Sequence, residues 1–199
     1  MSQALEKLEQ RVLGTDVPRK VKIATDWLEA CAGCHMSLLD IDERIIELLK
    51  HAEITSSPIT DLKHPPEEGV DVGILTGSVG NTDQLEIAKE MRKRCKILIA
   101  FGDCAVFNPA PIPSMRNFFD KDDVLKRTYV ESESTVDGEI PKSGGLCELL
   151  EKVVGVGDVV KVDVYLPGCP PRADTIFYVL SELVAGRMPV LEDENLKYD

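Results

Sequence analysis

Short apolar runs alternate along the chain with segments whose apolar residues recur at helical spacing. The apolar runs predict strands, which cover residues Val21–Trp27, Glu53–Thr60, Val70–Thr76, Lys96–Phe101 and Val159–Leu166. The helical spacing predicts helices over residues Ser37–Ala52, Asp83–Arg94 and Ala173–Ala185. At the start of the first helix, Ser37 and Asp40 are expected to form a capping pair.

Strands and helices that alternate in this way indicate a parallel sheet covered on both faces. We therefore expect an α/β fold, a flavodoxin-like parallel sheet of order 2-1-3-4-5, with an insertion before the last strand. The alternation stops between about Ala105 and Gly145, and an insertion of this kind is usually functional or covered by a partner. The predicted organisation is an N-terminal arm over 1–20 with a short amphipathic helix over 2–16, a domain over 21–190, and a C-terminal tail over 191–199.

Composition narrows the classes of function. A length of 199 residues suits one α/β domain. The formal net charge is −12, and no stretch of the sequence is strongly basic, which disfavours nucleic acid and anionic membranes as partners. The negative charge either keeps the protein soluble or helps it to dock onto partner subunits. No apolar run is long enough to span a bilayer, and the start of the chain shows neither an apolar signal core nor a twin-arginine pair. We expect a cytoplasmic protein, whose six cysteines are metal ligands or free thiols rather than disulfides.

Four cysteines follow the ends of predicted strands. Cys31 comes soon after the first strand with Cys34 one turn further on, while Cys104 and Cys169 follow the fourth and fifth strands. Ligands of such sheets bind beyond the carboxyl ends of the strands, so we expect all four thiols at one edge. One C-x-x-C pair plus two distant cysteines is less typical of structural zinc and suits an iron–sulfur cluster held by four thiolates. Four unrelated thiols and a zinc site are the alternatives.

Backbone features beside the cysteines favour the same chemistry. The turn at Cys31 opens a helix, and the N–H groups and positive dipole at a helix start favour an anionic group such as iron-bound thiolates. Gly33, Gly102 and Gly168 stand next to the cysteines, where they let backbone N–H groups approach the sulfurs and tune a redox potential.

The remaining candidates have simpler interpretations. Cys95, at a helix end, and Cys147, in an apolar helical stripe, are expected in the core. Cys31 to His35 matches the C-x-x-C-H haem attachment pattern, which requires export, so His35 is interpreted as a packing residue near the thiols. The turn Gly77–Asn81 is either a flavin phosphate site or a plain turn beside the cluster.

The motifs taken together resemble a known family. They are Trp27–Leu28, Cys31–Ser37, Gly77–Val79, Ala100–Ala105 and Leu166–Pro171. This set is similar to the small subunit of NiFe hydrogenases, which is related to the 20 kDa subunit of NADH:quinone oxidoreductase. It most resembles the short form of soluble NAD-reducing (bidirectional) hydrogenases. The resemblance covers the chain from Val21 to Val190. No cysteine follows Cys169, whereas longer small subunits carry further cysteines for additional clusters.

The resemblance implies an electron carrier without catalytic residues of its own. Cys31, Cys34, Cys104 and Cys169 would ligate one 4Fe–4S cluster, proximal to a NiFe centre on a separate large subunit. Electrons would pass from H₂ through this cluster to diaphorase subunits with FMN and further iron–sulfur clusters, and reach NAD, as in a hydrogen dehydrogenase. The alternatives are the small subunit of another cytoplasmic hydrogenase, sulfhydrogenase-like or F420-linked, and a structural module that binds zinc.

Overall fold

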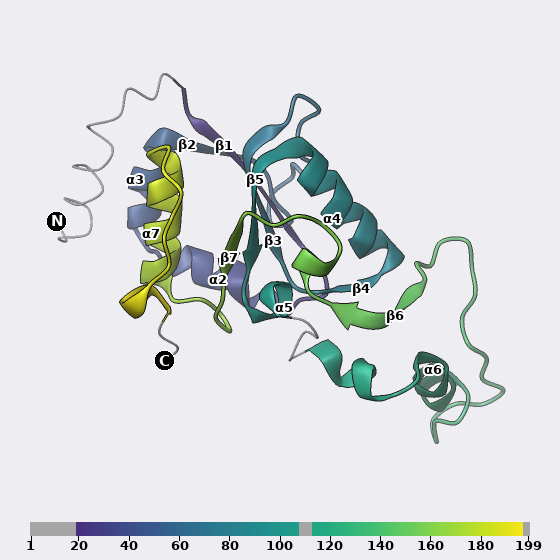
Figure 1. Cartoon of the computed structure of the whole chain (residues 1–199). Helices are drawn as coiled ribbons and strands as arrows, with labels where there is room; N and C mark the ends of the chain where they lie inside the picture. The colour runs from purple at the N-terminus through teal and green to yellow at the C-terminus, as the bar shows by residue number, and fades with distance from the viewer. Residues whose placement is uncertain (1–18, 108–112, 197–199) are drawn as a thin grey trace.

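The chain is described by a computed structural model over residues 19–107 and 113–196 (Figure 1). Its main sheet has five strands in the order β2-β1-β3-β5-β7, and every neighbouring pair is parallel. The strands are β1 (Val21–Trp27), β2 (Ala52–Ser56), β3 (Val70–Thr76), β5 (Cys95–Phe101) and β7 (Val164–Leu166). The predicted α/β fold and strand order are confirmed, because these are the first to fifth strands of the sheet along the chain.

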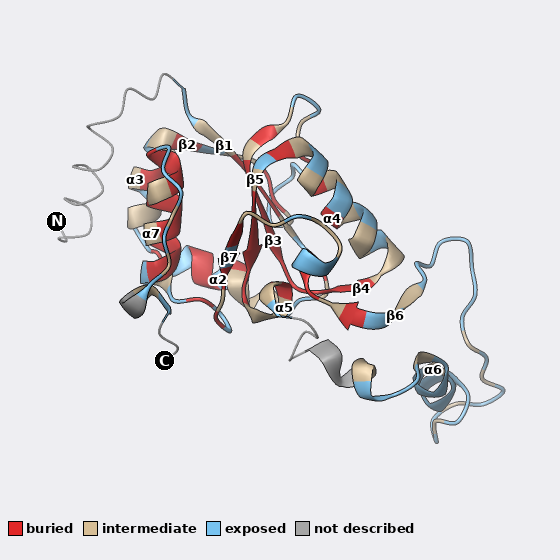
Figure 2. Cartoon of the chain, in the orientation of Figure 1, coloured by how far each residue is buried: buried red, intermediate tan, exposed pale blue. Residues whose placement is uncertain are grey.

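Helices cover both faces of the sheet (Figure 1). On one face lie α2 (Gly33–Leu39), α3 (Arg44–His51) and α7 (Ala173–Val184). On the other lie α4 (Thr82–Arg94) and α5 (Asp103–Val106). Successive strand residues point to opposite faces, so Ile74 belongs to the first core and Leu75 to the second. Figure 2 shows the buried residues concentrated along the strands and on α7.

The single helix predicted over Ser37–Ala52 is two helices, α2 and α3, separated by a turn in which Asp42 adopts a positive φ of 57°. The helix also begins earlier than predicted, at Gly33, behind an Ala32 N-cap with left-handed backbone. Ser37 therefore caps no helix. The apolar spacing did not reveal the break because Leu38, Ile41 and Leu48 all pack into one core.

The insertion contains structure that its composition did not predict. Strands β4 (Val79–Asn81) and β6 (Leu149–Val154) form a separate antiparallel pair. Between α5 and β6 lie a short 3-10 helix, η1 (Pro113–Phe118), and the helix α6 (Lys121–Tyr129), which extends away from the sheet in Figure 1. None of the described residues of α6 is buried, so its sequence carries no apolar stripe.

Three further expectations need correction. Cys147, predicted in the core of a helical segment, is exposed and precedes the strand β6, whereas Cys95 is buried as predicted. The last strand begins later than the predicted Val159, because only Val164–Leu166 pairs with β5, and a 3-10 turn, η2 (Val156–Asp158), stands before it. The second strand ends at Ser56, where the chain turns, rather than at Thr60.

The ends of the chain complete the description. A 3-10 turn, η3 (Asp193–Leu196), follows α7. The amphipathic helix predicted over 2–16 lies outside the described residues, as do residues 197–199 of the predicted tail. In the part of the chain that the structure describes, no helix has the length and apolar composition needed to cross a membrane.

Candidate metal centre

The four cysteines predicted as ligands all lie beyond the carboxyl ends of strands of the main sheet. Cys31 follows β1, and Cys34 lies in the first turn of α2. Cys104 lies in α5, directly after β5, and Cys169 lies in the loop after β7. Cys31 and Cys169 are exposed, and Cys34 and Cys104 are half-buried, so the thiols reach the surface of the molecule. The topology thus brings together residues that are far apart in sequence.

The thiols are close enough to influence one another. Burial raises the pKa of Cys34 to about 12, and the charges of Cys104, Cys31, Cys169 and Asp103 contribute to this rise. Burial likewise raises the pKa of Cys104 to about 11, with contributions from Cys169, Cys31 and Asp103. The pKa of Cys169 is raised by burial and by Asp103 and Cys31. These thiols keep their protons at neutral pH unless positive ions displace them, so metal binding here would release protons.

Glycines allow the backbone to approach the sulfurs. The Gly33 N–H donates to Cys31 Sγ (3.4 Å). Gly102 has a φ of +89°, and a Cβ on it would lie 2.3 Å from Cys34 Sγ. Gly168 has a φ of +132°, and a Cβ there would lie 2.5 Å from the Pro171 backbone. A side chain at Gly33 or Gly102 would fill space beside a thiol, whereas one at Gly168 would collide with its own loop, so the first two glycines keep room for a group bound to the sulfurs.

Hydrogen bonds join the loops that carry the cysteines. The Asp103 N–H donates to the Gly168 carbonyl (2.9 Å), and the Gly168 N–H donates to Asp103 Oδ1 (2.6 Å). The Ser37 hydroxyl of α2 donates to the Pro171 carbonyl (2.6 Å). Sequence analysis missed the roles of Asp103 and Ser37. The position of Asp103 directly before Cys104 was the one available signal.

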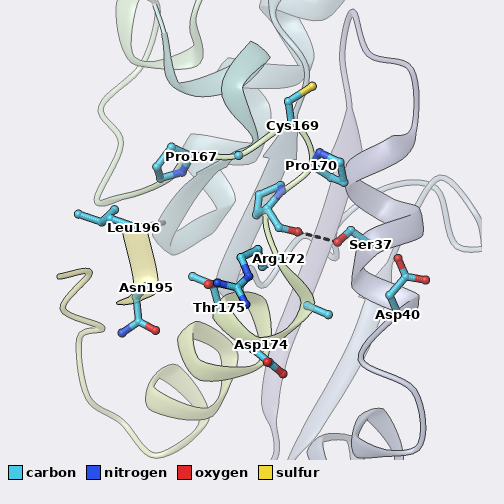
Figure 3. A pocket seen from close by; sticks show the side chains of 13 residues that line it. Ser37, Asp40, Pro167, Cys169, Pro170, Arg172, Asp174, Thr175, Asn195 and Leu196 are labelled. Carbon is cyan, nitrogen blue, oxygen red and sulfur yellow. Dashed lines mark hydrogen bonds between the residues drawn. The ribbon is translucent and has the colours of Figure 1, made fainter. Parts of the chain in front are cut away.

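A pocket of about 530 Å³ lies beside the Cys169 loop. It is lined by that loop, the start of α7, Ser37 of α2, Asp40 directly after α2, and η3. Figure 3 shows the Ser37–Pro171 hydrogen bond at its wall and the sulfur of Cys169 pointing away from its centre. Of the four cysteines, Cys169 lines the pocket, and Cys31, Cys34 and Cys104 do not.

His35 is held inside the fold beside Cys34. Its Nε2 lies 3.2 Å from Thr25 Oγ1, and its Nδ1 lies 3.3 Å from Thr76 Oγ1. The Trp27 ring contacts it edge-on, with centroids 5.6 Å apart. Burial lowers the pKa of His35, so the ring is neutral. The packing interpretation is confirmed. Both ring nitrogens have partners, so the C-x-x-C-H pattern does not present a free ligand for haem iron.

Of the predicted turn Gly77–Asn81, Gly77 and Ser78 form the turn and Val79–Asn81 is the strand β4. The Ser78 N–H donates to the Glu29 carbonyl (3.1 Å), and the Gly80 N–H donates to Gln84 Oε1 (2.8 Å). The Asn81 side chain caps α4 by accepting from the Gln84 N–H. Since these groups already have partners, the geometry favours the plain turn over a flavin phosphate site.

A single-ion site receives no support from the arrangement of ligands. Within residues 19–107 and 113–196, no group of three or more His, Cys, Asp or Glu side chains is spaced to hold one metal ion. Structural zinc needs all four ligands within about 2.0–2.3 Å of one ion. In a cluster each thiolate binds a different iron, so the thiolates stand further apart. A donor set of four thiols from three strand ends suits such a cluster.

Comparisons with known proteins agree on one family. The family model described as NADH ubiquinone oxidoreductase, 20 kDa subunit, matches residues 31–183. The NAD-reducing hydrogenase HoxS subunit delta of Cupriavidus necator is 39% identical over 183 residues, which are 90% of this chain and 86% of that protein. A subunit of the F420-non-reducing hydrogenase of Methanothermobacter thermautotrophicus is 38% identical over 180 residues, 89% of this chain. The chain spans 58% of the length of that relative.

Solved structures show the same fold. A chain from the crystal structure of an NAD⁺-reducing NiFe hydrogenase in the H₂-reduced state superposes with a TM-score of 0.85 at 35% identity. The match covers 91% of this chain and 100% of that chain. A chain of the Dm. baculatum NiFeSe hydrogenase matches at 19% identity with a TM-score of 0.55, which shows the likeness of fold alone.

Proposed function

The chain belongs to the family of the NADH ubiquinone oxidoreductase 20 kDa subunit, and we propose that it is the electron-transfer small subunit of an NAD-reducing NiFe hydrogenase. The observation that carries the proposal is the convergence of Cys31, Cys34, Cys104 and Cys169 at one edge of the sheet. Likeness to the HoxS delta subunit and to a chain of an NAD⁺-reducing hydrogenase supports the assignment.

The four cysteines would hold one 4Fe–4S cluster. The donor set is four thiols, the glycines leave room beside the sulfurs, and the Gly33 N–H already donates to one of them. Such a cluster, when bound, supplies one-electron transfer. The residues of this chain hold it, orient it near the surface and set its potential through their hydrogen bonds and charges. The chain itself contributes no catalytic residue.

The proposal places the other redox groups on partner subunits. A large subunit would carry the NiFe centre that splits H₂, and it would face the edge of the sheet where Cys31 and Cys169 are exposed. Diaphorase subunits with FMN and further iron–sulfur clusters would pass the electrons on to NAD. We place this assembly in the cytoplasm, without a membrane or nucleic acid partner.

A second candidate is the small subunit of another hydrogenase. Its support is the match to the F420-non-reducing hydrogenase of Methanothermobacter thermautotrophicus, whose identity is close to that of the HoxS delta subunit. This chain spans 58% of the former relative and 86% of the latter. We favour the NAD-reducing function because the match to the HoxS delta subunit covers more of the relative's own length. Partners that copurify, with or without NAD-dependent activity, distinguish the two.

The experiment is a metal analysis of the anaerobically purified chain with the partners that copurify. In comparison with a Cys104→Ser complex, the wild-type complex should hold about four more iron and four more sulfide per chain, and an additional EPR signal should appear on reduction with dithionite. Cys104→Ser and Cys169→Ser should lose this signal and stop H₂-dependent reduction of NAD⁺. Cys147→Ser, at an exposed cysteine outside the site, is the matched control and should keep both. Zinc in place of iron, or an intact cluster in both site variants, would refute the assignment.

A further inference from the structure

We infer that Asp103 is a positioning residue, whose carboxylate holds the Cys169 loop against Cys104 and whose negative charge lowers the reduction potential of the iron–sulfur group. This inference rests on the proposed function, because it concerns the group that the four cysteines would hold. It adds a residue that ligates nothing and lies between two of the ligand loops.

The Cys169 loop has few backbone donors with which it could be fixed. Its residues 167–171 read Pro-Gly-Cys-Pro-Pro, so Gly168 and Cys169 alone have backbone N–H groups there. The Gly168 N–H donates to Asp103 Oδ1 at 2.6 Å, a short distance that is typical of a charge-assisted hydrogen bond. The Asp103 N–H returns a bond to the Gly168 carbonyl (2.9 Å). One side chain thus supplies the acceptor for half of the donors in this loop.

This reciprocal pair also sets where Cys169 stands relative to Cys104. Asp103 directly precedes Cys104, and Gly168 directly precedes Cys169. The pair follows the last paired residues of the two strands, Phe101 of β5 and Leu166 of β7. The pairing between β5 and β7 therefore continues beyond the ends of the two strands and fixes the two ligand loops against each other.

The charge of Asp103 acts on the site itself. Its carboxylate lies 2.6 Å from the N–H of Gly168, the neighbour of Cys169, and Asp103 is itself the neighbour of Cys104, so its negative charge stands beside two ligand residues and repels added negative charge. The same repulsion opposes the addition of one electron to a cluster bound to these sulfurs. Cluster potentials respond to nearby charge and to hydrogen bonds at the sulfurs. Removing this charge, with the hydrogen bond kept, should therefore raise the potential.

The molecule offers a matched control at the opposite end of the same strand pair. There the Asp163 N–H donates to the Leu98 carbonyl (2.9 Å), and the Leu98 N–H donates to Asp163 Oδ2 (2.9 Å). The geometry repeats that of Asp103 and Gly168. Burial raises the pKa of the Cys95 thiol, and the charge of Asp163 raises it further. Cys95 is not one of the four cysteines of the site. Asp163→Asn thus disturbs the same kind of contact far from the site.

The test compares wild type, Asp103→Asn, Asp103→Ala and Asp163→Asn, each purified anaerobically as the full chain with its partners. Asparagine keeps an oxygen that accepts from the Gly168 N–H but loses the charge, whereas alanine loses both. Three quantities are measured: the iron and sulfide that belong to this chain (the excess over a Cys104→Ser complex), the EPR spectrum of the reduced sample and the midpoint potential from a redox titration. We expect wild-type iron content and a more positive midpoint potential in Asp103→Asn. Asp103→Ala should lose more than half of its iron, and Asp163→Asn should keep both iron and potential.

Each other outcome overturns a stated part of the inference. An Asp103→Asn variant with the wild-type potential, or an equal shift in Asp163→Asn, would refute the charge effect. An Asp103→Ala variant with full iron content, or an Asp103→Asn variant without iron, would refute the positioning role of the hydrogen bond. A wild-type chain without iron or a reducible signal would refute the proposed function as well, so the two failures are distinguishable.

Discussion

Among the glycines beside the four cysteines, Gly102 is the one whose replacement by alanine should damage the thiol site most. Gly102 has φ +89° and ψ 158°, a backbone region that is essentially restricted to glycine and costs about 1–3 kcal/mol for other residues. The new Cβ would also lie 2.3 Å from Cys34 Sγ. Ordinary contacts are about 3.5–4.0 Å, so the sulfur has to move by more than about 1 Å. Overpacking of this kind costs about 1–3 kcal/mol more.

Gly186→Ala separates the backbone strain from the collision. Gly186 also has a positive φ, +74°, but a Cβ there meets no atom within 4 Å. This control should lose about 1 kcal/mol, from strain alone. In a chain of this size, each kcal/mol lowers the Tm by about 2–4 °C. Gly102→Ala, with about 2–6 kcal/mol in total, should lower the Tm by about 4–24 °C.

The assay is the ratio of iron to protein, with thermal unfolding followed by circular dichroism, for both variants prepared anaerobically. We expect Gly186→Ala to keep the wild-type iron content and Gly102→Ala to lose most of it, since the displaced Cys34 sulfur can no longer serve as a ligand. If Gly102→Ala had the iron content and Tm of Gly186→Ala, the close approach of this backbone to the thiol would have no consequence, and the reasoning would be wrong.

Two further changes test contacts away from the sulfurs. Asp71→Asn should destabilise the chain by about 1–2 kcal/mol at neutral pH. Burial alone would raise the pKa of Asp71, but hydrogen bonds from Arg19 and Lys96 lower it overall. The stabilisation is therefore present above about pH 4 and is lost as the pH falls further. Urea unfolding should show that the difference in unfolding free energy between wild type and Asp71→Asn shrinks in acid, and a difference that stays constant with pH would contradict this. Ser37→Ala removes the hydrogen bond to the Pro171 carbonyl and should cost about 1 kcal/mol. It should also speed the loss of iron to a chelator, and an unchanged release rate would show that this bond does not hold the Cys169 loop.

The sheet and the place of the thiols could be predicted because both depend on burial. Buried parallel strands leave apolar runs such as Val70–Thr76, and their order fixes which loops share an edge. The positions of Cys104 and Cys169 beyond β5 and β7 follow from this order alone. The prediction that these thiols bind iron is of another kind, because it depends on their chemistry and on the family, and it stays open to the metal analysis.

Contacts between distant residues could not be predicted from local patterns. Ser37 with Asp40 three residues later matches a helix start, yet the Ser37 hydroxyl is used by Pro171, 134 residues away. Asp103 binds an N–H group 65 residues away. In the insertion, α6 has no buried residue, so its apolar spacing did not reveal it; the available signals were the Asp120 N-cap with acidic residues in the first turn and basic residues in the last.

The insertion is joined at its start to α5, which carries Cys104, and at its end to β6, which lies outside the five-stranded sheet. The ligand loops follow β1, β5 and β7 of the five-stranded sheet, whose register is fixed by two buried cores. The insertion returns through β6, which pairs with β4 outside that sheet. The 3-10 helix η1 of the insertion is held against β6 by Asn117. The Asn117 side-chain amide donates to the Val153 carbonyl (2.8 Å), and its oxygen accepts from the Val153 N–H (2.7 Å). A partner that moves α6 therefore pulls on β6 and β4 at one end of the insertion and on α5 at the other.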